Sequence, residues 1–120
     1  TWLEDENIVS PNGMNFSDGE VLIGTKKGIY GVRIEDKRIW QIVSVDGGID
    51  GLKLYDKNNY IISDWVGRVQ MVSPGDENLL LLDLSKKNMN AADLEYIPEN
   101  NLLLIPTFSD NRVVAYELIN

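Results

Sequence analysis

The sequence of 120 residues contains neither cysteine nor histidine. The absence of cysteine excludes disulfides, thiol nucleophiles and thiolate metal sites. The absence of histidine excludes serine–histidine and cysteine–histidine nucleophile systems, zinc sites built on imidazole, and the usual general base at neutral pH. Any catalysis must therefore use carboxylates, amides, hydroxyls, lysine or a metal held by oxygen atoms.

Basic residues and long hydrophobic runs are also scarce. Eleven Lys and Arg residues stand against 19 Asp and Glu, which gives a net charge of −8. Nucleic-acid binding needs a basic surface, so we expect no nucleic-acid partner. The run Leu79 to Leu82 ends at Asp83 and is far too short to span a membrane, so we expect no membrane insertion. The acidic surface is compatible with cations and with neutral or cationic ligands. The lack of cysteine permits export, and we favour a periplasmic or extracellular location over a cytoplasmic one.

A short pattern occurs three times along the chain. Asn12-Gly13-Met14, Asp50-Gly51-Leu52 and Ala92-Asp93-Leu94 each begin an apolar segment, and turns separate it from further apolar segments. The repeats start at positions 12, 50 and 92, so they lie 38 and 42 residues apart, the length of one four-stranded propeller blade. Turn signals interrupt every apolar run, and no run keeps a helical period. The pattern therefore predicts an all-β protein.

The predicted strands group into about three blades, the last of them incomplete. The repeats cover approximately 8–46, 47–88 and 89–120, and residues 1–7 are expected to be the tail of a preceding outer strand. A helical turn is plausible only within 85–93. We predict strands at 13–16, 21–25, 28–34, 39–45, 51–55, 60–64, 68–73, 78–84, 93–97, 102–107 and 112–118.

Three blades are too few to close a propeller ring, which typically has four to eight. The chain starts with Thr1, so it is either a processed protein or a part of a longer one. Two solutions supply the missing blades. One is the remainder of a longer chain, and the other is a head-to-tail homodimer in which Trp2 and Leu3 of one copy complete the last blade of the other.

Polar residues precede the innermost strand of each predicted blade, where they converge on the channel mouth. These positions hold Asn12, Asp50 and Ala92-Asp93. Amide and carboxylate oxygens suit a hard divalent cation such as calcium, and a carboxylate can take a proton from water. In the alternative interpretation, Asn-Gly and Asp-Gly only form left-handed or bulged turns. Asp93 aligns with Gly13 and Gly51, which leaves its direction open.

A second repeated position follows the second strand of each blade and includes Asp64 and Trp65. Both are further candidates for the channel mouth. Trp65 and Phe108 could flank a ligand, although such aromatics more often pack between adjacent blades. Ser63 and Asp64 could instead hold neighbouring turns through side-chain hydrogen bonds, a structural role.

The strings Ser10-Pro11-Asn12-Gly13-Met14 and Ile49-Asp50-Gly51-Leu52 resemble the paired motifs of the gluconolactonase and senescence-marker propellers. The wider group includes the strictosidine-synthase-like propellers. The resemblance implies a six-bladed propeller in which Asn12 and Asp50 bind a divalent metal and Asp50 is the general base. A further glutamate ligand of that family has no counterpart here. The pattern is also similar to NHL-type propellers that bind without catalysis.

Two functions follow as hypotheses. The first is a metal-dependent hydrolase of a lactone or small ester, with Asn12 and Asp50 at the cation and Asp50 acting on water. The second is a non-catalytic propeller that binds a small molecule or a protein, in which the same residues shape the channel mouth. Fold alone does not choose between them.

Overall fold

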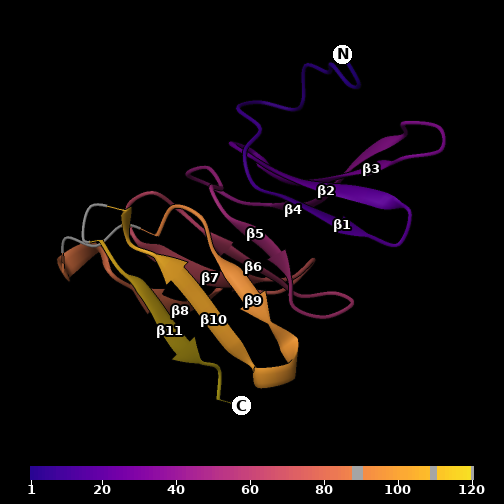
Figure 1. Cartoon of the computed structure of the whole chain (residues 1–120). Helices are drawn as coiled ribbons and strands as arrows, with labels where there is room; N and C mark the ends of the chain where they lie inside the picture. The colour runs from indigo at the N-terminus through magenta and orange to yellow at the C-terminus, as the bar shows by residue number, and fades with distance from the viewer. Residues whose placement is uncertain (88–90, 109–110, 120) are drawn as a thin grey trace.

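The chain forms an all-β structure of three antiparallel sheets in a computed structural model that describes residues 1–87, 91–108 and 111–119 (Figure 1). The molecule is elongated, with extents of 42 × 27 × 26 Å. Within the described ranges there is no α-helix, and no helix is long and apolar enough to cross a membrane.

Each sheet is a meander in which consecutive strands are hydrogen-bonded neighbours. The first sheet comprises β1 (Met14–Ser17), β2 (Glu20–Thr25), β3 (Gly28–Arg33) and β4 (Ile39–Ser44). The middle sheet comprises β5 (Leu52–Leu54), β6 (Tyr60–Ser63), β7 (Arg68–Val72) and β8 (Leu79–Asp83). The third sheet comprises β9 (Glu95–Ile97), β10 (Leu102–Pro106) and β11 (Val113–Glu117). Two 3₁₀ turns, η1 (Ser85–Lys87) and η2 (Pro98–Asn100), complete the elements.

Tight turns define the hairpins. Between β1 and β2, Asp18 and Gly19 have φ of 42° and 81°. Two consecutive residues with positive φ match the right-handed twist of the flanking strands, and Asp-Gly is a favoured sequence for such a turn. The turn fixes the pairing of Ser17 with Glu20, and with it the register of the first two strands.

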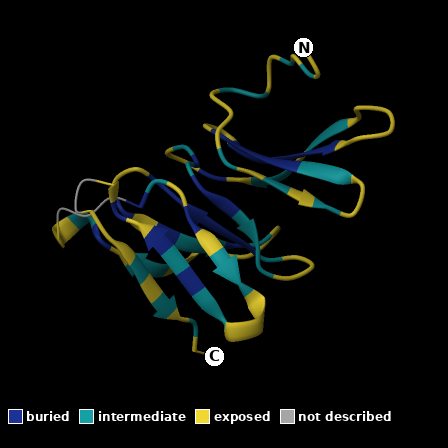
Figure 2. Ribbon diagram, viewed as in Figure 1, coloured by how far each residue is buried: buried dark blue, intermediate teal, exposed yellow. Residues whose placement is uncertain are grey.

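The hydrophobic core lies in two layers, one on each side of the middle sheet (Figure 2). Alternate residues of β6 serve the two layers, because successive side chains of a strand point to opposite faces. Ile62 packs with Leu22 and Ile29 of the first sheet, whereas Ile61 packs with Leu103 of the third sheet. The middle sheet is therefore covered on both faces, and the outer sheets each keep one face without a neighbouring sheet.

All eleven predicted strands are present, with ends that differ by one or two residues. The helical turn expected within 85–93 is the 3₁₀ turn Ser85–Lys87. In this structure residues 1–13 contain no strand. The assignment of residues 1–7 to a preceding outer strand stays a prediction. The predicted boundary between the second and third repeats, at 88–89, falls outside the described residues. The three sheets do not close into a ring.

Candidate functional site

The repeated motifs lie at one end of the innermost strands, and backbone hydrogen bonds tie the first two of them to their own sheets. The Asn12 amide donates to the Gly24 carbonyl at 3.0 Å, and the Asp50 amide donates to the Ser63 carbonyl at 2.8 Å. Gly24 and Ser63 occupy matching positions at the ends of β2 and β6. The same local pairing therefore places Asn12 and Asp50 at corresponding points of adjacent sheets.

Glycine follows Asn12 and Asp50 because the inner strands approach each other closely. A Cβ atom at Gly13 would lie 2.3 Å from the Asp50 carbonyl oxygen, and one at Gly51 would lie 3.1 Å from the Leu94 amide nitrogen. Neither glycine has a positive φ. The left-handed turn interpretation is thus wrong for both, and the glycines instead let the neighbouring motifs come together.

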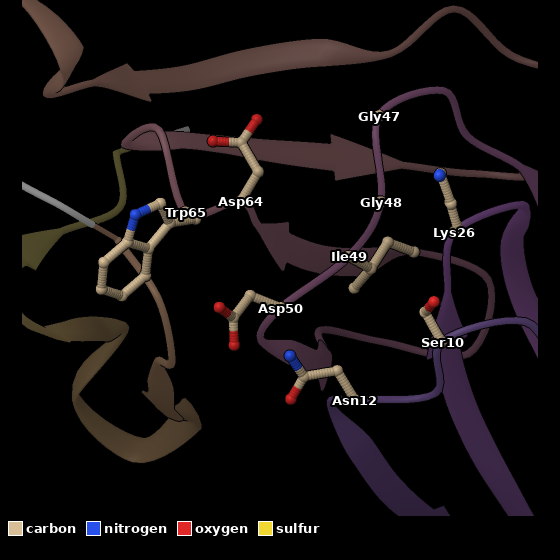
Figure 3. Close-up of a pocket in the computed structure, with 9 residues that line it drawn as sticks. All are labelled: Ser10, Asn12, Lys26, Gly47, Gly48, Ile49, Asp50, Asp64 and Trp65. Atoms are coloured by element: carbon tan, nitrogen blue, oxygen red, sulfur yellow. The ribbon is translucent and has the colours of Figure 1, made fainter.

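Asn12, Asp50 and Asp93 form one polar cluster, although they are far apart in sequence. Asn12 donates a side-chain hydrogen bond to the Asp50 carboxylate (Figure 3). Burial raises the pKa of Asp50, the negative charge of Asp93 raises it further, and the bond from Asn12 acts in the opposite direction. All three residues border a hollow of about 280 Å³, together with Lys53. Asp93 also lines a hollow beside Leu104 and Val113, and its carboxylate accepts a hydrogen bond from the Leu94 amide at 2.8 Å.

Ser63 links the loops that carry the two carboxylates. Its Oγ accepts a hydrogen bond from the Gly51 amide at 3.0 Å and donates one to the Ala92 carbonyl at 2.6 Å. Both partners are direct neighbours in sequence of a cluster carboxylate. The expected structural role of Ser63 is confirmed, and its effect is to fix the spacing of Asp50 and Asp93.

Asp64 is committed to a turn rather than to the cluster. Its carboxylate accepts hydrogen bonds from the backbone amides of Gly67 and Arg68 at 3.1 and 3.0 Å, and from Arg68 Nε at 2.8 Å. The residue is 8% exposed. These contacts satisfy the carboxylate locally and hold the β6–β7 hairpin. They support the structural role that the sequence left as an alternative.

A second hollow, of about 270 Å³, adjoins the cluster (Figure 3). Trp65 borders it and is 50% exposed, and its ring meets Phe108 edge to face with centroids 5.3 Å apart. The two aromatics thus contact each other across adjacent sheets, but both are exposed, Phe108 to 73%, and Trp65 lines the hollow. The lining residues are Ser10, Asn12, Lys26, Gly47, Gly48, Ile49, Asp50, Asp64 and Trp65.

The cluster supplies some, but not all, of the oxygen ligands that a hard cation needs. Two carboxylates and one amide supply oxygen ligands, and a cation would relieve the repulsion between Asp50 and Asp93. Rotation of the Asn12 amide would present its oxygen in place of its nitrogen. In the described part of the chain no group of three or more Asp, Glu, His or Cys side chains gathers for a metal. Calcium takes six to eight oxygens, so water or further groups would complete the shell.

Comparisons with known proteins bear on the fold. No protein-family model matches the chain, and no curated protein matches it. The computationally designed Ika4 protein has a similar structure, with a TM-score of 0.61 and 17% identity over 91% of this chain and 66% of that one. The designed Ika8 protein gives 0.60 and 18% over 90% and 33%. The chain thus spans about two thirds and one third of these proteins. The likeness supports the all-β fold alone.

Proposed function

We propose that this chain is a run of β-propeller blades that binds a divalent cation, calcium in the first place, at Asn12, Asp50 and Asp93. The observation that carries the proposal is the convergence of these three side chains from the starts of three successive sheets. The repeat length of 38 and 42 residues and the four-stranded meanders support the propeller. The resemblance to the gluconolactonase group supports the cation site.

The activity proposed for this site is hydrolysis of a lactone or a small ester. The cation, when bound, supplies Lewis-acid polarisation of a carbonyl oxygen. The Asp50 carboxylate accepts the proton of an attacking water. Asn12 and Asp93 hold the cation together with Asp50, and Ser63 keeps the two carboxylate loops in place.

A second candidate function is binding of a small molecule without catalysis. The hollow beside the cluster favours it, because Trp65 offers an aromatic face and Lys26 a positive charge at its border. The localisation favoured above, periplasmic or extracellular, would supply calcium at concentrations that suit weak sites.

Thermal melting with calcium and then with a chelator tests the cation site. A cation that binds only the folded chain raises the midpoint: at a hundred times its Kd it stabilises by about 2.7 kcal/mol. Asp50→Asn should abolish the shift. Asp46→Asn, an exposed residue of the same loop, removes the same charge and should retain it. No shift in the wild-type chain, or an equal shift in Asp50→Asn, would remove the cation proposal.

A panel of lactones and small esters separates the enzyme from the binder once cation binding is established. The hydrolase proposal predicts turnover that depends on calcium and is lost in Asp50→Asn. Saturable ligand binding without turnover would favour the non-catalytic function.

A further inference from the structure

The contact between the first and middle sheets and the contact between the middle and third sheets use residues at matching positions of the strands. These positions identify the residues through which each sheet packs on the next. In the first sheet, Leu22 and Ile29 face the middle sheet and are 1% and 0% exposed. The strand registers place Ile61 and Val69 at the matching positions of the middle sheet. Both are 0% exposed against the third sheet.

The third sheet presents the same positions to solvent. The residues that match Leu22 and Ile29 are Leu104, which pairs with Ala115, and Val113, which pairs with Pro106. Val113 is 67% exposed, Ala115 and Pro106 are exposed as well, and Leu104 is half-buried. We call Leu104, Pro106, Val113 and Ala115 the tail face. The corresponding apolar faces of the first and middle sheets are each covered by the following sheet.

The first sheet carries the opposite face. Met14 follows Gly13 as Leu52 follows Gly51 and as Leu94 follows Asp93. Leu52 and Leu94 are 1% and 3% exposed, because each packs on the preceding sheet, whereas Met14 is 61% exposed. Phe16, on the same side of β1, is 64% exposed. We call Met14 and Phe16 the head face.

A missing strand and an unpaired segment accompany these faces. In the described residues the third sheet has three strands and ends at β11, whereas the other sheets have four. Residues 1–6 precede Met14 by the same 13 positions that separate Ile39–Ser44, the fourth strand of the first sheet, from Leu52. Figure 1 shows this segment on the side of the first sheet away from the middle sheet.

The side chains of residues 1–6 match the edge of β11. In the register of β4 on β3, Trp2 takes the position of Trp40, which lies over Gly31 so closely that a Cβ there would be 2.7 Å from its ring. The position that matches Gly31 in the third sheet is Ala115, whose Cβ occupies this space, so Trp2 has to lie further from the sheet than Trp40 does. The same register puts Glu6 opposite Arg112, a pair of opposite charge.

We propose that the chain associates head to tail with a second copy of itself. The head face of one copy covers the tail face of the other, and residues 1–6 add to β11 as its fourth strand. Two copies make two such joints and close a ring of six sheets, twice the three of one chain. Asp93 stands at the position that Gly13 and Gly51 occupy in the other two sheets. The contact between the two copies is therefore wider at the start of the inner strands. The proposal does not depend on the cation.

Size-exclusion chromatography with light scattering tests the association. The wild-type chain is expected at twice the mass of one chain. Met14→Asp on the head face and Val113→Asp on the tail face should each give monomers. Leu80→Asp, at an apolar residue of β8 that is 52% exposed, is the control and should leave the dimer intact. Circular dichroism checks the fold of each variant, and Ala115→Glu replaces Val113→Asp if that variant unfolds.

Mixing the two monomeric variants distinguishes head-to-tail from symmetric contact. A mixed pair keeps one wild-type joint, the head face of the Val113→Asp chain on the tail face of the Met14→Asp chain, so dimers should reappear. A wild-type monomer at every soluble concentration overturns the proposal and leaves both faces to sheets of another chain or chain segment. A dimer that only one variant disrupts, or an open series of higher oligomers, overturns it as well.

Discussion

The groups around Asp50 shift the pKa of its carboxyl group in opposite directions. Burial disfavours its charged form, and the charge of Asp93 adds to this effect, while the Asn12 amide stabilises the carboxylate by a hydrogen bond. The net result is a raised pKa. In its charged form such a residue lowers the stability of the folded chain, and it readily binds a cation or a proton. This combination is common at functional sites.

The pH dependence of stability follows from this raised pKa. A folded chain that holds the Asp50 proton more tightly than the unfolded chain gains stability from this group at low pH and loses it as the pH rises through the raised pKa. In chelator at neutral pH, Asp50→Asn should therefore be more stable than the wild type, by roughly 0.5 kcal/mol for a partly exposed charge pair. The gain should shrink in acid. Urea unfolding at several pH values measures it, and a variant that is less stable at neutral pH would contradict the cluster.

Asp64, in contrast to Asp50, stabilises the fold, because its nearly buried carboxylate accepts hydrogen bonds from the turn that follows it. Asp64→Ala leaves the Gly67 and Arg68 amides without their acceptor and should cost about 2–3 kcal/mol. Asp36 is the matched control: it also accepts from a backbone amide, that of Arg38, and pairs with an arginine, but it is exposed. Asp36→Ala should change stability little. Denaturant unfolding compares the two, and equal losses would show that burial of the Asp64 turn contributes nothing.

At the scale of elements, close approach of the inner strands decides where glycine is needed. A methyl group at Gly13 would meet backbone atoms of the middle sheet, at 2.3 Å from the Asp50 carbonyl oxygen and 2.8 Å from the Leu52 amide nitrogen. Backbone cannot move aside as a side chain can, so the two sheets would have to separate.

Gly13→Ala should accordingly cost about 3 kcal/mol through overpacking. Gly48→Ala provides the contrast: its φ of 83° strains an alanine, yet no atom lies within 4 Å. We expect a loss of about 1 kcal/mol there. Thermal unfolding measures both variants. A smaller loss at Gly13 than at Gly48 would contradict the close contact of β1 with the middle sheet.

Hydrophobic segments and turn residues were enough to predict the strands, since each apolar run is short and ends at a turn. The pairing of Asn12 with Asp50 was also predictable, because both begin a repeat in the same register. The place of Asp93 was not, because its offset by one residue left its relation to the other two open, and only the structure shows that it borders the same hollow. Residues 1–6 contain no strand in the single chain, and a strand there needs a sheet edge to pair with.

At the scale of the whole molecule, the polar cluster and the exposed sheet faces have one origin. Three sheets that repeat the same packing bring the starts of their inner strands together, and they leave the last face on each side uncovered. The same repetition thus provides a site assembled from residues about 40 positions apart and the surfaces on which a further sheet can pack.

Calorimetric titration of calcium into the wild-type chain, Asp93→Asn and Asp46→Asn tests most directly whether the three sheets assemble one site. Loss of a charge-assisted contact of about 1.5–3 kcal/mol corresponds to an affinity lower by about ten- to a hundredfold. We predict saturable binding by the wild type, an affinity lower by this factor in Asp93→Asn, and no change in Asp46→Asn. Equal binding by the wild type and Asp93→Asn, or no binding by the wild type, would contradict it.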